Sequence, residues 1–189
     1  MLNWVLGRKK TANKGKAGQK KKPSYEESKR VAAKGDAKAR AELAAHEDLE
    51  PEFLYFFATD EDANVRRAVA KNEGTPLQAD IILAKDIDER VREELAFKIG
   101  RLVPTLTDQE SEQLVEMTFQ VLEILAQDQV PKIRSIIADE IKHLSNVPKR
   151  LIARLAEDAE AAVAGPILEY SPLLTDEQIL QIISGGLRG

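Results

Sequence analysis

The chain has 189 residues, enough for one ordinary domain with a substantial core, and its net charge is −4. The absence of cysteine excludes disulfides and thiolate metal sites and suits a reducing, cytoplasmic location. No apolar run approaches the roughly 20 residues needed to span a bilayer. The apolar start is too short for a signal peptide, so we expect a protein that is neither exported nor integral to a membrane.

The first residues are strongly basic and the remainder is acidic. Residues 1–22 hold eight basic and no acidic residues, which leaves 20 basic and 32 acidic residues in the rest. Residues 8–24 are rich in Lys and Gly and show no apolar periodicity, as is typical of disorder. We therefore expect a basic, largely disordered arm with a short apolar start over 1–24, a helical repeat domain over 25–184 and a tail over 185–189.

The arm has the composition of a weak peripheral membrane anchor. Its apolar side chains would enter the lipid interface while its basic ones meet anionic headgroups, each contributing up to ~1 kcal/mol. Salt-sensitive contact with nucleic acid and a merely solvated tail are the alternatives. The candidate contact residues are Leu2, Trp4, Val5, Leu6, Arg8, Lys9, Lys10, Lys20, Lys21 and Lys22.

Helical periodicity begins at Tyr25, and an internal repeat follows. An Asp, then four residues, then Val or Ile and Arg recurs from Asp60 to Asp86 and again at Asp128. A copy without the Arg begins at Asp158, and Asp36 matches one period before the first copy. Each copy carries apolar residues at i and i+4, which predicts one helix per copy. We expect these helices to be capped by carboxylates or opened by proline, at Asp36, Asp62, Asp88 and Pro131.

Partner helices are expected between these copies. They are predicted over 50–57, 75–83, 107–126, 147–153 and 175–183, and three of them open with Pro near the first turn. The segment 107–126, about five turns long, explains why the spacing from Asp86 to Asp128 is stretched. The repeated unit is therefore a helical hairpin, and about five of them would stack to cover one another's apolar faces.

The Asp–x4–Val–Arg pattern resembles the HEAT-repeat family over about residues 30–170. The resemblance implies an all-α, right-handed solenoid in which Asp and Arg form a structural ladder between hairpins, here Asp60, Arg66, Asp86, Arg92, Asp128 and Arg134. Residues 163–180 are similar to an uncharacterised bacterial HEAT-like family of unknown function. That likeness implies a bacterial cytosolic setting but does not point to any particular reaction.

The residues that might carry chemistry have structural interpretations. Arg40 and the ladder arginines could bind phosphate, but an Arg copied together with its Asp favours a brace. His46 and His143 lack further ligands at helical spacing, and no phosphate loop or nucleophile elbow occurs. The cluster of Phe53, Tyr55, Phe56 and Phe57 favours core filling over a binding hot spot. We expect no catalytic, cofactor-binding or metal-binding residue, and hence no enzyme.

The sequence thus favours a non-enzymatic scaffold or adaptor for a protein partner. Its acidic body predicts a basic or mixed-charge partner. The arm would tether it to the inner face of the membrane, and the apolar edge at 175–183 would allow self-association. The alternative is a nucleic-acid-binding protein similar to the HEAT-like alkylpurine DNA glycosylases, which the acidic body and the single Trp, in the arm, disfavour.

Overall fold

The computed structural model describes residues 22–106 and 110–186, and the prediction of an all-α protein is confirmed there. These residues form eleven α-helices and one 3-10 helix and contain no strand. None of these helices is long and apolar enough to cross a membrane. The helices belong to two compact units, and the boundary between the units falls between Leu83 and Ala84.

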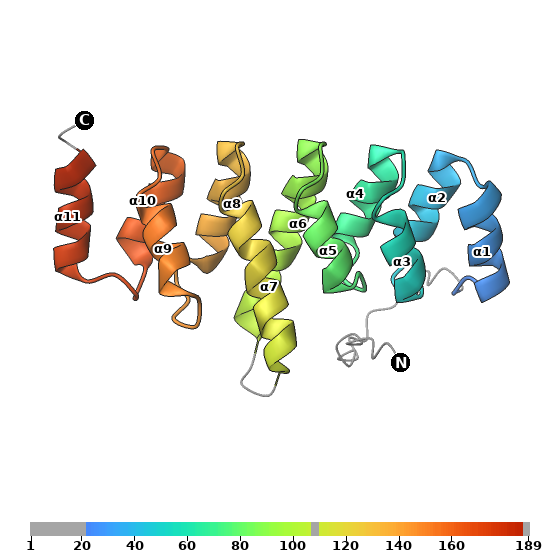
Figure 1. Cartoon of the computed structure of the whole chain (residues 1–189), viewed down its shortest axis with the longest axis horizontal. Helices are drawn as coiled ribbons and strands as arrows, with labels where there is room; N and C mark the ends of the chain where they lie inside the picture. Colours follow the sequence, from blue (N-terminus) through green and yellow to red (C-terminus); the bar gives the residue numbers. More distant parts are fainter. Residues whose placement is uncertain (1–21, 107–109, 187–189) are drawn as a thin grey trace, which may run out of the picture. The chain divides into compact units, whose positions relative to one another are not determined.

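Unit 1 contains five short helices. Within this unit, α2 packs most extensively against α4, and α3 contacts α2, α4 and α5 (Figure 1). Its core contains the fully buried side chains of Leu54, Phe57, Val65 and Val69. The helices are α1 (Tyr25–Lys34), α2 (Ala37–Ala44), α3 (Pro51–Phe57), α4 (Ala63–Lys71) and α5 (Leu77–Leu83).

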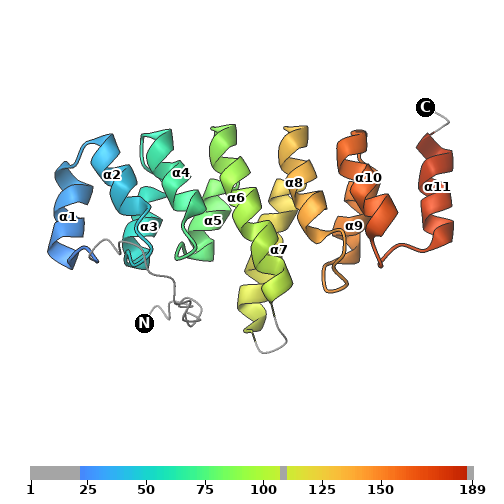
Figure 2. The ribbon, with the colours of Figure 1, turned by 180° about the vertical axis from the view of Figure 1, so that it is seen from behind.

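Unit 2 contains two rows of helices. In one row α6 packs against α8 and α8 against α10, while α7 and α9 lie alongside as a second row (Figure 2). Isoleucine, leucine and valine fill the space between the rows, as at Ile99, Leu125 and Ile137. The helices are α6 (Glu89–Leu102), η1 (Val103–Thr105), α7 (Glu112–Leu125), α8 (Pro131–Ile141), α9 (Lys149–Ala156), α10 (Ala161–Tyr170) and α11 (Asp176–Gly186).

Four helices begin where the sequence supplies a capping aspartate or an opening proline. The side chain of Asp36 accepts from the amide of Ala39, and Asp62 and Asp88 cap α4 and α6 in the same way. Pro131 opens α8, where its missing N–H has no partner to lose. These four predicted starts are confirmed.

The predicted boundaries differ from the structure at several places. The helix expected from 107 begins at Glu112, because Ser111 accepts a hydrogen bond from the amide of Leu114 and so caps it. Part of the extra length belongs to α6, which reaches Leu102 and continues into η1. The predicted arm lies outside the described residues except for 22–24, where Ser24 already caps α1, and α11 reaches Gly186.

Two glycines inside helices have different physical reasons, a close contact at Gly100 and a following proline at Gly165. A Cβ atom at Gly100 of α6 would lie 2.6 Å from Cγ of Glu140, so glycine sets how closely α6 and α8 approach. Gly165 precedes Pro166 inside α10. A residue before proline resists the helical conformation because its Cβ meets the proline ring, and glycine avoids that clash.

Candidate functional site

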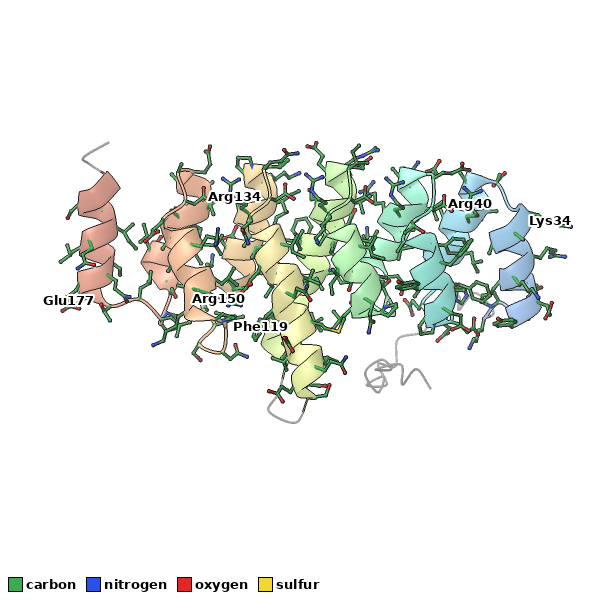
Figure 3. The ribbon with its side chains drawn as sticks, viewed as in Figure 1. Lys34, Arg40, Phe119, Arg134, Arg150 and Glu177 are labelled. Atoms are coloured by element: carbon green, nitrogen blue, oxygen red, sulfur yellow. The ribbon has the colours of Figure 1, made fainter. Side chains whose placement is uncertain are left out.

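Three arginines each bind an aspartate of the next hairpin through two parallel hydrogen bonds. Arg92 donates from Nε and Nη2 to the two oxygens of Asp128 at 2.6 and 3.0 Å. Arg134 reaches from α8 to Asp158, in the turn before α10, at 2.6 and 2.9 Å (Figure 3). In unit 1, Arg40 and Asp60 repeat this geometry at 2.7 and 2.9 Å.

The remaining terminal nitrogen of these arginines binds the main chain. Nη1 of Arg92 donates to the carbonyl of Asp86 at 2.6 Å, and Nη1 of Arg134 donates to the carbonyl of Asp128 at 2.7 Å. The aspartates are held too, since Asp128 accepts from the amide of Val130 and Asp158 from that of Glu160. Each arginine therefore ties the turn before its own helix to the turn of the next hairpin.

Hydrogen bonding within these pairs shifts the pKa values of Asp60, Asp158 and Arg92 toward the charged forms. The hydrogen bond from Arg134 outweighs the effect of burial and holds the pKa of Asp158 below its ordinary value. Burial acts to raise the pKa of Asp60, but hydrogen bonds from Arg40 and from the Asp62 amide outweigh it and lower this pKa as well. The pKa of Arg92 is raised by its hydrogen bond to Asp128. These guanidinium groups are already engaged, which makes them poor receptors for a phosphate.

The two other predicted ladder residues, Arg66 and Asp86, each make a hydrogen bond within their own unit. Arg66 donates from Nη1 to the carbonyl of Asp60 at 2.7 Å, and Asp86 accepts from the amide of Asp88 at 2.8 Å. Because Arg66 belongs to unit 1 and Asp86 to unit 2, a bond between these two residues stays a prediction. At the other end of the series, Ala164 occupies the position where Arg would follow Asp158.

The two histidines have packing and surface roles. Nδ1 of His46 accepts from the amide of Asp48 at 3.3 Å, and its carbonyl accepts from the side chain of Asn72 at 3.0 Å. The ring of His143 meets the ring of Tyr170 edge-on at 5.1 Å, and the ammonium of Lys142 lies 5.1 Å from the centre of the same ring. In the described residues no group of three or more His, Asp or Glu converges to hold a metal.

The aromatic cluster of α3 divides between core and surface. Phe53 and Phe57 are buried, as expected, whereas Tyr55 and Phe56 are exposed, which corrects the prediction of core filling. The physical reason is that Phe53, Leu54 and Phe57 share the buried face of the helix, while Tyr55 and Phe56 lie on the other side. The exposed aromatic residues of the described chain are Tyr25, Tyr55, Phe56, Phe97 and Tyr170.

An aromatic seam runs between α1 and α3, and we name it the α1–α3 seam, formed by Tyr25, Ala32, Ala33, Phe53 and Phe56. The ring of Tyr25 contacts that of Phe53 at 5.3 Å between centres. At the other end, the side chain of Phe56 is 58% exposed and borders an open hollow of about 340 Å³. Ala32 and Ala33 of α1 line the hollow opposite Phe56. The seam thus has an apolar lining with an aromatic ring at each end.

The rim of this hollow carries an excess of negative charge. Arg40, Asp60 and Glu61 all line it, so two carboxylates face one guanidinium. The side chain of Arg40 is only 13% exposed and is engaged by Asp60, whereas that of Glu61, 3.3 Å from Nη2 of Arg40, is 88% exposed. The accessible charge is therefore the carboxylate of Glu61, which favours a cation beside the apolar lining.

The candidate contact residues of the arm lie outside the described residues, except for Lys22. Its ammonium lies 3.2 Å from Oε1 of Glu50, just before α3. The sequence did not predict this seam; the one signal that could have suggested it is an aromatic residue in the first turn of each helix, Tyr25 in α1 and Phe53 in α3. Comparisons of the chain with protein-family models, with curated proteins and with solved structures found no match.

Proposed function

We propose that this chain is a non-enzymatic scaffold that binds a protein partner through the α1–α3 seam. The observation that carries the proposal is Phe56, an exposed aromatic ring that borders a hollow lined in part by Ala32 and Ala33 of α1. Exposed aromatic residues are enriched among the residues that dominate binding energy in protein interfaces. A helical scaffold needs no reaction to use such a surface.

The chemistry of the seam defines the partner. An apolar or aromatic side chain fits the lining formed by Ala32, Ala33 and Phe56. The exposed carboxylate of Glu61 favours a neighbouring Lys or Arg, whose aliphatic stem also packs against aromatic rings. The partner is therefore a peptide segment in which an apolar residue is flanked by basic ones.

Selection from a displayed random-peptide library by the intact chain tests this proposal. We expect enriched peptides to combine aromatic or aliphatic residues with Lys or Arg, and to lose binding at least tenfold to the Phe56→Glu variant. The control is Tyr170→Glu, which alters an aromatic residue of unit 2 that is 45% exposed and should leave binding unchanged. Peptides that bind the Phe56→Glu variant as tightly as the unmodified chain would refute the seam as the site.

The right-handed HEAT-like solenoid is part of the same proposal. It is supported by the equal geometry of the Arg40–Asp60 joint in unit 1 and the Arg92–Asp128 joint in unit 2. A compact globule of this length would have a radius of gyration of about 16 Å. Small-angle X-ray scattering should give a clearly larger value for the stacked array, and a value of about 16 Å would contradict it.

We propose that the basic arm tethers this scaffold to an anionic membrane surface. The support is the order of its residues, in which Leu2, Trp4, Val5 and Leu6 precede eight basic residues without any acid. A nucleic-acid ligand would require only the charge, whereas a lipid interface also uses the apolar start. The two therefore differ in their dependence on Trp4.

A further inference from the structure

Helix α11 differs from the other helices of unit 2 because it buries none of its described side chains. The apolar residues Ile179 and Ile182 are half-buried. Leu180 and Ile183 are exposed by 63% and 50%, respectively. These values are high for large aliphatic side chains, which are normally buried. The helix is nevertheless well formed at its start, since Thr175 and Gln178 exchange hydrogen bonds in a capping box.

The exposed surface of α11 has both a projection and a hollow. Leu180 projects from the helix, and beside it lies an open hollow of about 310 Å³, lined by Leu180, Gln181, Ser184 and Gly185. The hydroxyl of Ser184 donates to the carbonyl of Leu180 on its own helix, so it does not demand a partner in the hollow. Gly185 adds no side chain, and no atom lies within 4 Å of where its Cβ would be.

This surface is complementary to itself. Two copies of α11 packed antiparallel about a twofold axis level with residue 182 place Leu180 of each copy opposite Ser184 of the other. The projection of one copy then enters the hollow of the other, twice, as a twofold interface requires. Residues 178–186 carry no charge, so no like charges face each other across this contact.

We propose that a second copy of this chain docks on α11, forming an antiparallel, twofold-symmetric pair in which Leu180 of each copy packs on Ser184 and Gly185 of the other. The proposal is independent of the partner bound at the α1–α3 seam. It gives the scaffold two seams per assembly, and two linked sites raise the avidity for a multivalent partner.

Sedimentation equilibrium of the full chain over a range of concentrations tests the pairing. We expect the mass to rise from 21.0 kDa toward twice that value as concentration increases. Leu180→Glu should remain at the mass of one copy at every concentration, because it places a charge in an apolar contact. The matched control is Ile87→Glu, which changes another exposed isoleucine, 93% exposed and outside α11, and should pair like the unmodified chain.

A mixing experiment tests the register. Ser184→Arg alone should weaken pairing, because it fills the hollow with a charged side chain. An equal mixture of Leu180→Glu and Ser184→Arg chains should recover the paired mass, since Glu at 180 of one copy then faces Arg at 184 of the other. Circular dichroism confirms that each variant is folded. A constant mass of 21.0 kDa for the unmodified chain, pairing that survives Leu180→Glu, growth beyond two copies, or a mixture that stays unpaired would each overturn the proposal.

Discussion

Arg92 and Asp128 lie at the most buried of the Arg–Asp joints, with side chains exposed by only 7% and 4%. Taking two charges out of water costs free energy that their attraction offsets only when the geometry is good and the remaining hydrogen bonds are satisfied. Both conditions are met, because Arg92 also donates to the carbonyl of Asp86 and Asp128 also accepts from the amide of Val130. Such a joint holds the turn at Asp86 beside the turn at Asp128.

Replacing Arg92 by Lys should destabilise unit 2 even though the charge is kept. An ammonium group cannot make two parallel bonds to Asp128 and still reach the carbonyl of Asp86, so we expect a loss of about 1.5–3 kcal/mol. The measurement is the urea midpoint by far-ultraviolet circular dichroism. The control is Arg90→Lys, since Arg90 pairs with Asp88 on the exposed surface, where the midpoint should not change. Equal midpoints for the two variants would contradict the bracing role of Arg92.

The lowered pKa of Asp158 predicts a dependence of stability on pH. Because this pKa is lower in the folded chain than the unfolded value of about 3.9, the pair stabilises the fold above that pH. This contribution is lost as the pH falls below 3.9 and through the folded pKa. Urea midpoints between pH 7 and pH 2 should therefore fall less steeply for Asp158→Asn than for the unmodified chain. In an Arg134→Met background, Asp158→Asn should alter the slope much less, because only the hydrogen bond from the Glu160 amide then lowers this pKa. An undiminished effect would show that the pair with Arg134 is not its cause.

At the scale of elements, the packing of α6 against α8 depends on a missing side chain. A Cβ atom at Gly100 would lie 2.6 and 2.7 Å from Cγ and Cβ of Glu140, distances that atoms do not adopt without movement. Alanine would favour the helix by up to about 1 kcal/mol over glycine. Overpacking costs about 1–3 kcal/mol, which exceeds this gain, so the net effect of Gly100→Ala on stability is a loss.

Gly100→Ala should accordingly lower the thermal midpoint of the chain. The new methyl group would clash with the side chain of Glu140. The same substitution made in a Glu140→Gly background should therefore be neutral or stabilising. This reversal separates a steric cause from any general intolerance of position 100. A loss of stability that is equally large in both backgrounds would show that the contact between α6 and α8 is not responsible.

Most helices could be predicted from the sequence because their signals are local. Apolar residues at i and i+4 and carboxylates such as Asp62 and Asp88 act within one turn of the chain, and the structure places caps and helices where they indicate. The start of α7 was missed because Ser111 competes with an equally suitable Thr107 as a cap. The α1–α3 seam was missed for a different reason, because exposure of Phe56 depends on the packing of α1, which is not encoded within α3.

At the scale of the whole molecule, the charge is divided between two parts with opposite preferences. Residues 1–22 carry only basic charge, and the remainder carries 12 more acidic than basic residues. An acidic body is repelled from an anionic surface, so attraction must come from the arm and must weaken with salt. Lys22 is the one basic residue of the arm that the structure describes, and it contacts Glu50 of the body.

The arm should therefore bind anionic vesicles through its charge and its apolar start together. Sedimentation with phosphatidylcholine vesicles, with and without phosphatidylserine, should show binding only with the anionic lipid, and raising the salt should reduce it. Trp4→Glu should lower the bound fraction several-fold while leaving all eight basic residues in place, and deletion of residues 2–22 should abolish binding. Unchanged partitioning of Trp4→Glu, together with equally tight, salt-sensitive binding to duplex DNA, would show that the arm recognises polyanions in general. The two outcomes differ in their dependence on the apolar start, because only a lipid interface would bury Leu2, Trp4, Val5 and Leu6.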